Sequence, residues 1–132
     1  MSLQPRVGCG AFIQDSEGRL LLVKRRRDPE ADHWGLPGGK LDFGETVKAC
    51  IAREILEELG IEIKVGALLC VVDQIAAESH WVAPTHRASI TNGAPSIQEP
   101  LALADWGWFA LDQLPVPLTL ATRTALAALE SL

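Results

Sequence analysis

Short apolar runs bounded by turn residues occur near both ends of the chain, and they predict β-strands. The first two runs, residues 7–14 and 19–25, lie on either side of the sequence Asp-Ser-Glu-Gly at 15–18. Two apolar runs around a short glycine-containing turn are typical of a β-hairpin. The sequence therefore predicts that these runs pair with each other.

Three later runs also predict strands. The run at residues 61–75 is rich in β-branched residues and contains Gly66, which predicts a break into two strands. The run at 80–91 contains Pro84, and because proline cannot donate a ladder hydrogen bond, it predicts an edge strand or a bulge. The run at 105–111 predicts a short aromatic strand with two tryptophans on one face.

Two segments carry apolar residues at helical spacing. The first follows the polar pair Glu45 and Thr46 and stops at Gly60, a common helix terminator. Its apolar positions recur every four residues, at Val47, Ile51, Ile55 and Leu59. The second helix is predicted over residues 118–132. Strands around one central helix, with a second helix at the end, predict one α+β domain over residues 1–132 with α/β/α layers.

Glu54, Glu57 and Glu58 lie on one narrow arc of the first predicted helix, because they occupy positions i, i+3 and i+4. Like charges at this spacing repel each other by roughly a few tenths of a kcal/mol per pair. A divalent cation, which prefers hard oxygen ligands, would turn this repulsion into binding. The arc thus indicates a metal site, and the alternative is a solvated acidic face.

The segment at residues 39–61, GKLDFGETVKACIAREILEELGI, resembles the Nudix box of the Nudix (MutT-type) pyrophosphohydrolases. The box consists of Gly, five residues, Glu, seven residues, Arg-Glu, an apolar residue, any residue, Glu-Glu, any residue, Gly and an apolar residue. The sequence meets it at Gly39, Glu45, Arg53, Glu54, Ile55, Glu57, Glu58, Gly60 and Ile61. The resemblance implies the Nudix fold, a mixed sheet sandwiched between helices. It also implies hydrolysis of a nucleoside diphosphate linked to another group.

The resemblance further implies a metal cofactor, Mg²⁺ or Mn²⁺, bound by carboxylates of the box. Glu57 and Glu58 match the primary metal ligands, and Glu54 matches a further ligand or the general base. The main-chain carbonyl of Gly38 matches another ligand.

Residues outside this ligand set have implied roles as well. Arg53 and Glu45 are expected to support catalysis as an ion pair that orients the loop of the box. Many family members add a carboxylate from a loop before a late strand. Glu99 is the best candidate for this extra ligand, and Asp105 is the alternative.

Three positions are candidates for substrate binding. Residues 24–27 form a basic cluster that strand alternation divides between two faces, one of which could meet phosphate, and we take Arg26 as the binding residue. Gly39 allows close approach of the backbone to a ligand. Trp34 either packs against a base or closes the core, and the sequence leaves this choice open.

The net charge of −5 argues against a nucleic-acid polymer as the partner, because a bound polymer needs a basic face. A small nucleotide remains compatible, since a bound metal reverses the local charge. The three cysteines are widely spaced in apolar surroundings, which predicts reduced core residues. No run approaches the length of a membrane span and no signal peptide is visible, so we expect a cytoplasmic protein. A homodimer is expected by analogy alone.

The short length, the segment LPGGKLDFGE and the Glu-Pro that precedes Trp-Gly-Trp resemble the small nucleoside-triphosphate pyrophosphatases. These enzymes release a monophosphate and pyrophosphate from (d)NTPs or modified nucleotides, and this is the predicted activity. Two alternatives stay open: an ADP-ribose or nucleotide-sugar pyrophosphatase, and a non-catalytic nucleotide-binding module. RNA-end decapping is disfavoured by the acidic charge.

Overall fold

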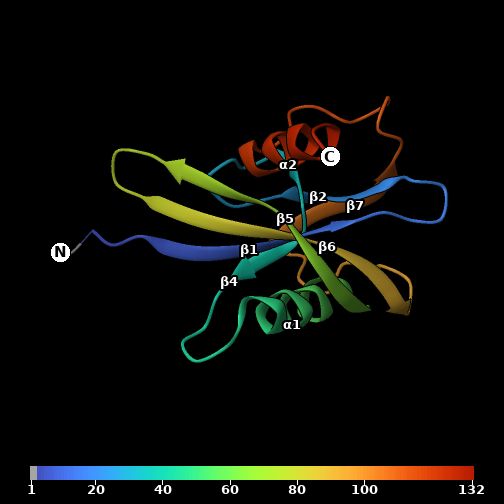
Figure 1. The fold of residues 1–132 in the computed structure, drawn as a ribbon, viewed down its shortest axis with the longest axis horizontal. Coiled ribbons are helices and arrows are strands. Elements are labelled where there is room, and N and C mark those ends of the chain that lie inside the picture. Colours follow the sequence, from blue (N-terminus) through green and yellow to red (C-terminus); the bar gives the residue numbers. More distant parts are fainter. Residues whose placement is uncertain (1–2) are drawn as a thin grey trace.

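Two β-sheets form the middle of the fold, and one helix lies on each side of them (Figure 1). The structure is a computed structural model that describes residues 3–132. In chain order the elements are β1 (Arg6–Ile13), β2 (Leu20–Arg25), β3 (Trp34–Gly35), β4 (Gly38–Lys40), α1 (Val47–Leu59), β5 (Glu62–Ile75), β6 (His80–Asn92), β7 (Leu103–Phe109) and α2 (Leu120–Glu130). This arrangement confirms the predicted α+β class and its α/β/α layers.

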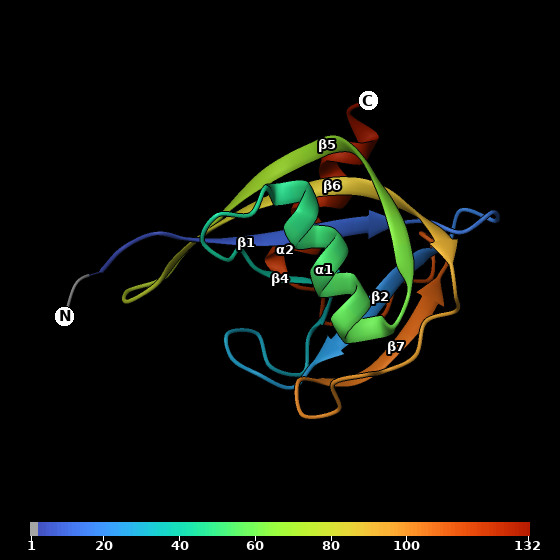
Figure 2. The same ribbon diagram turned by 90° about the horizontal axis from the view of Figure 1, so that it is seen from below.

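The four-stranded sheet has the order β4-β1-β6-β5 (Figure 2) and is mixed, since β1 runs parallel to β6 while the other pairs are antiparallel. The three-stranded sheet has the order β3-β2-β7 and is antiparallel. The predicted hairpin of β1 and β2 is wrong, because the two strands belong to different sheets. They meet at a bridge between Gln14 and Leu20.

The position of β2 explains this difference. Leu21 and Val23 belong to the core cluster that includes the buried face of α1. Leu20 and Leu22 point the other way, into the cluster that contains Ala125 of α2. A strand that is apolar at consecutive positions is buried on both faces. Such a strand takes the central place between two helices, here between β3 and β7.

Helix α1 forms as the sequence predicts. The side chain of Thr46 caps its first turn by accepting from the N–H of Ala49 at 3.1 Å. Gly60 ends it in the left-handed conformation, with φ of 68°. Ile51, Ile55 and Leu59 are fully buried. The opposite face of the helix is left to carry polar residues.

Two predictions about the long strands need correction. β5 runs through Gly66 without a break, and a register shift between Val65 and Leu68 absorbs the irregularity as a bulge. β6, which contains Pro84, is an interior strand and not an edge strand. A second register shift, between Leu68 and Cys70 of β5, lies beside the proline, in agreement with the predicted bulge.

Candidate active site

Arg53 connects the acidic residues of the box. Its Nε donates to Glu45 Oε2 at 3.0 Å and its Nη2 to Glu45 Oε1 at 2.6 Å, so the predicted ion pair is present and bidentate. Its Nη1 donates to Glu54 Oε1 at 2.9 Å and to Glu57 Oε2 at 3.3 Å. Its Nη2 also reaches the carbonyl of Lys40 at 3.1 Å. Arg53 therefore fixes the loop between β4 and α1 to the polar face of the helix.

Glu58 is the buried carboxyl of the box, with a relative exposure of 7%. Its pKa is raised to about 8, first by burial and then by the nearby carboxylates of Glu54 and Glu99, against smaller opposing effects of the Gly38 N–H and Arg25. Burial also raises the pKa of Glu54, and Arg53 opposes that shift. Both shifts disfavour the ionised carboxylates, first because the groups are buried and second because other carboxyls lie nearby.

Glu99 lies within electrostatic reach of the box, since it raises the pKa of both Glu54 and Glu58. Its loop is fixed to the C-terminal end of α1, where Gln98 N donates to the carbonyl of Glu58 at 2.9 Å. Asp105 instead accepts from the N–H of Trp106 at 2.8 Å and pairs with β2. The geometry therefore favours Glu99 over Asp105 as the extra carboxylate.

Gly38 and Gly39 of β4 are needed for close packing. A Cβ on Gly38 would overlap the carbonyl of Cys9 in β1. A Cβ on Gly39 would lie 2.8 Å from Glu54 Cγ and closer still to the Glu54 carboxylate. The backbone of β4 thus packs directly against Glu54, one of the candidate metal ligands.

We expect Gly39→Ala to fold but to lose activity about tenfold to a hundredfold, because the added methyl displaces the Glu54 carboxylate. Thermal unfolding and steady-state kinetics check both parts. As a control, the same change in a Glu54→Gln background should cost little more, since both changes act through one side chain. Full additivity would show that Gly39 acts by another route.

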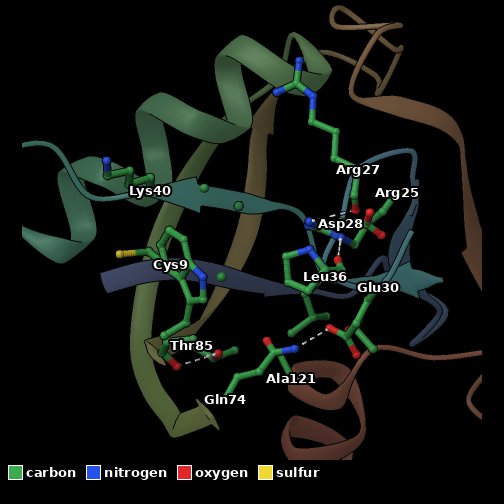
Figure 3. Close-up of a pocket in the computed structure, with 18 residues that line it drawn as sticks. Cys9, Arg25, Arg27, Asp28, Glu30, Leu36, Lys40, Gln74, Thr85 and Ala121 are labelled. Atoms are coloured by element: carbon green, nitrogen blue, oxygen red, sulfur yellow. Dashed lines mark hydrogen bonds between the residues drawn. The ribbon is translucent and has the colours of Figure 1, made fainter. Parts of the chain in front are cut away.

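A pocket of about 400 Å³ lies on the other side of β4 (Figure 3). Its lining comes from β1, the end of β2 and the loop after it, the β3–β4 connection, β4, β5, β6 and the start of α2: Gly8, Cys9, Gly10, Arg25, Arg27, Asp28, Pro29, Glu30, Leu36, Gly38, Gly39, Lys40, Gln74, Trp81, Ala83, Thr85, Thr119 and Ala121. Arg27 and Lys40 lie toward α1, and Gln74 and Glu30 lie at the opposite side (Figure 3). The size is in the range of small-molecule sites, which starts at about 300 Å³.

Of the three residues predicted to bind substrate, only Gly39 lines this pocket. Arg26 donates from Nε to the carbonyl of Pro100 at 2.8 Å, and Trp34 packs edge-to-face on Phe109 at 5.1 Å between ring centroids. The structure therefore gives Trp34 the core role of the two that the sequence left open. Arg26 does not line the pocket, whereas its neighbours Arg25 and Arg27 do.

Sequence reasoning missed Trp81, Gln74 and Glu30, which come from segments far from the box. The glycines of β1 were the one available signal, since glycine in a strand interior permits close approach. Gly8 and Gly10 indeed line the pocket, and a Cβ on Gly8 would lie 3.3 Å from the Trp81 ring. The pairing that brings Trp81 beside β1 is not visible in the sequence.

No three His, Cys, Asp or Glu side chains of residues 3–132 converge closely enough to surround a cation. Instead, Arg53 bridges Glu54 and Glu57 through Nη1. The available donors still fit a hard divalent cation in kind, because they are carboxylates whose mutual repulsion a cation would relieve. Binding would require these side chains to turn toward one another.

The chain matches the NUDIX domain family over residues 4–129 and belongs to that family. Its fold is similar to the crystal structure of a MutT NUDIX hydrolase from Burkholderia pseudomallei, with 56% identity, a TM-score of 0.91, and coverage of 95% of this chain and 98% of that chain. A Mycobacterium tuberculosis protein named "Putative 8-oxo-dGTP diphosphatase 2" is 36% identical over 121 residues, which are 79% of this chain and 84% of that protein. An ADP-ribose pyrophosphatase of Methanocaldococcus jannaschii is 41% identical over 69 residues, 52% of this chain and 40% of that protein.

The family and its relatives identify the chain as an enzyme, a Nudix hydrolase that cleaves nucleotide anhydrides. Within residues 3–132, no helix has the length and apolar character needed to cross a membrane.

Proposed function

We propose that this enzyme is a metal-dependent pyrophosphohydrolase that converts (d)NTPs or modified nucleotides to a monophosphate and pyrophosphate. One observation carries the proposal: β4 separates a nucleoside-sized pocket from the carboxylates of α1 and contacts both. A nucleoside held in the pocket would have its phosphates directed along β4 toward α1.

The carboxylates would hold Mg²⁺ or Mn²⁺. Glu57 and Glu58 are the proposed primary ligands, Glu54 is a further ligand or the general base, and Glu99 and the Gly38 carbonyl complete the set. The bound metal would neutralise phosphate charge and lower the pKa of a bound water. When these side chains turn toward the metal, its positive charge would replace the Arg53 guanidinium as the partner of Glu54 and Glu57.

The pocket has two kinds of lining, basic side chains that suit phosphates and an aromatic side chain that suits a base. Arg25, Arg27 and Lys40 line the pocket and are the proposed phosphate contacts, since guanidinium and ammonium groups donate to phosphate oxygens. Trp81, with Gly8 beside it, offers a flat apolar wall for a base. Homodimerisation and a cytoplasmic location stay predictions.

The ADP-ribose or nucleotide-sugar alternative draws support from the Methanocaldococcus relative, which is an ADP-ribose pyrophosphatase. The non-catalytic alternative has no comparable support, because Glu45, Arg53, Glu54, Glu57 and Glu58 are all present. Product analysis separates the candidates. The enzyme is incubated with Mg²⁺ at slightly alkaline pH and a panel of (d)NTPs, 8-oxo-dGTP, ADP-ribose and nucleotide sugars.

Release of pyrophosphate from a triphosphate, with kcat/KM above that for ADP-ribose, is the expected result. Cleavage of ADP-ribose or sugar nucleotides into two phosphorylated halves at higher kcat/KM would establish the alternative. Tight nucleotide binding without any turnover would establish the binding module.

We expect Glu99→Gln to raise the Mg²⁺ concentration needed for half-maximal rate, while Asp105→Asn leaves it unchanged. Glu99 lies in a loop held to Glu58 through Gln98, whereas Asp105 accepts from the N–H of Trp106, the next residue in β7. The loss should be smaller than for Glu57 or Glu58, because water can replace a loop ligand. Side-by-side metal titrations measure it, and a shift in the Asp105 variant alone would reassign the role.

A further inference from the structure

A polar side chain at the far side of the pocket from α1 is held in one orientation by a relay of hydrogen bonds. Gln74 Nε2 donates to Glu30 Oε1 at 3.1 Å (Figure 3). Glu30 Oε2 in turn accepts from the N–H of Leu120, the first residue of α2, at 2.8 Å. The relay therefore joins β5, the loop after β2 and the second helix.

The carboxylate determines which way the amide points. A carboxylate can only accept hydrogen bonds, so the nitrogen of the Gln74 amide, and not its oxygen, must face Glu30. One N–H and the carbonyl oxygen of Gln74 then remain free. Within residues 3–132, no group donates to this oxygen. Gln74 thus presents one donor and one acceptor of fixed order at the pocket.

Register places Gln74 beside the aromatic wall. It pairs with Trp81 across the β5–β6 ladder, and directly opposed residues of an antiparallel pair share one face. Trp81, Ala83 and Thr85 follow on the same side of β6 at alternate positions, and all three line the pocket. A planar group packed against Trp81 would therefore have its edge near the Gln74 amide.

Glu30 is held against its own backbone preference. It adopts φ of 64°, a left-handed conformation that is uncommon and unfavourable for residues other than glycine. Asp32 in the same loop has φ of 63°. The two hydrogen bonds of the Glu30 carboxylate keep this loop at the pocket.

We infer that Gln74 is a specificity-determining residue that reads the polar edge of a nucleobase packed against Trp81, and that Glu30 is the positioning residue that fixes its amide. The ligand class is a nucleoside whose base carries an acceptor for the free N–H of Gln74 beside a donor for its carbonyl oxygen. This inference rests on the proposed nucleotide substrate and adds the residues that select its base.

The first experiment compares Gln74→Met with the parent on the four dNTPs, 8-oxo-dGTP and the abasic 2-deoxyribose 5-triphosphate. The ratio of kcat/KM for the preferred nucleotide to that for the abasic compound should fall about tenfold to a hundredfold, because the polar contact between Gln74 and the base is lost. Preference among the bases should flatten. Gln113→Met, an exposed matched change, should alter neither quantity. An equal loss on both compounds, or an unchanged base preference, would overturn the inference.

The second experiment tests positioning through Glu30→Gln. An amide at position 30 can donate to the Gln74 oxygen and turn that amide over, so the order of preference among bases should change. In a Gln74→Met background, Glu30→Gln should no longer affect base preference. A purely structural role would instead lower the melting temperature and all rates equally in both backgrounds, which would overturn the positioning role.

Failure of the proposed function would appear first in the parent, as absence of nucleotide hydrolysis. Calorimetry in EDTA then decides the inference, by measuring the binding of nucleoside 5′-monophosphates and of ribose 5-phosphate to the parent and to Gln74→Met. Weaker nucleotide binding by Gln74→Met, with unchanged ribose 5-phosphate binding, supports the base-reading role. Equal affinities of parent and variant for the nucleotides overturn it.

Discussion

Glu58→Gln should lower kcat about a hundredfold to a thousandfold while the protein stays folded, and Glu57→Gln should have a similar effect. Each change removes a negative charge from the proposed metal clamp, which weakens charge neutralisation at the phosphates. Glu130→Gln, an exposed change at the end of α2, is the matched control and should retain parent activity. Steady-state kinetics at saturating Mg²⁺ measure kcat for the parent and the three variants.

In the absence of metal, the Glu58→Gln variant should be more stable than the parent at alkaline pH. Burial raises the pKa of the Glu58 carboxyl from 4.5 to about 8. The folded state therefore keeps a proton that the unfolded state loses, and the stability of the parent falls as pH rises from about 4.5 to about 8. In EDTA the variant should match the parent at pH 5 and exceed it by a few kcal/mol at pH 9. A variant that is less stable at both pH values would give Glu58 a structural role instead.

Arg53→Lys should lower kcat about tenfold to a hundredfold and also lower the melting temperature. Arg53 holds Glu45 with two donors and reaches Glu54 and Glu57 with a third nitrogen. A single ammonium cannot hold three carboxylates in this arrangement. The exposed Arg123 of α2 provides the control, and Arg123→Lys should leave both quantities unchanged.

Acid titration gives the Arg53 prediction a second readout. The Arg53 guanidinium lowers the pKa of Glu45 from 4.5 to about 2. Because the folded pKa is the lower one, this pair stabilises the fold above about pH 4.5, and the stabilisation is lost as pH falls toward about 2. The stability difference between parent and Arg53→Lys should therefore shrink over this range. A difference that stays constant to pH 2 would contradict the ion-pair account.

The sequence was sufficient to predict α1 and its polar face. Helical spacing, the cap at Thr46 and the stop at Gly60 are local signals, because each acts through hydrogen bonds between residues close in sequence. The relative positions of Glu54, Glu57 and Glu58 follow from helix geometry alone. The ion pair of Arg53 and Glu45 was expected from the family resemblance and is present.

The pocket could not be predicted in the same way, because it depends on strand pairing between distant segments. Gln74 meets Trp81 through the β5–β6 ladder, and Trp81 reaches β1 through a parallel pairing. Nothing in the local pattern distinguishes that pairing from the hairpin of β1 and β2 that we expected. The local pattern also leaves the choice between Arg25 and Arg26 undecided, since alternation separates two faces but does not say which face meets the site.

The central claim is that the carboxylates of α1 act through a divalent cation on a nucleotide anhydride. The most direct test is turnover of the best substrate of the panel in excess EDTA, followed by addition of Mg²⁺ or Mn²⁺ above the chelator. We predict no turnover in EDTA and recovery of pyrophosphate release when free metal returns. Full turnover in excess EDTA would contradict the claim.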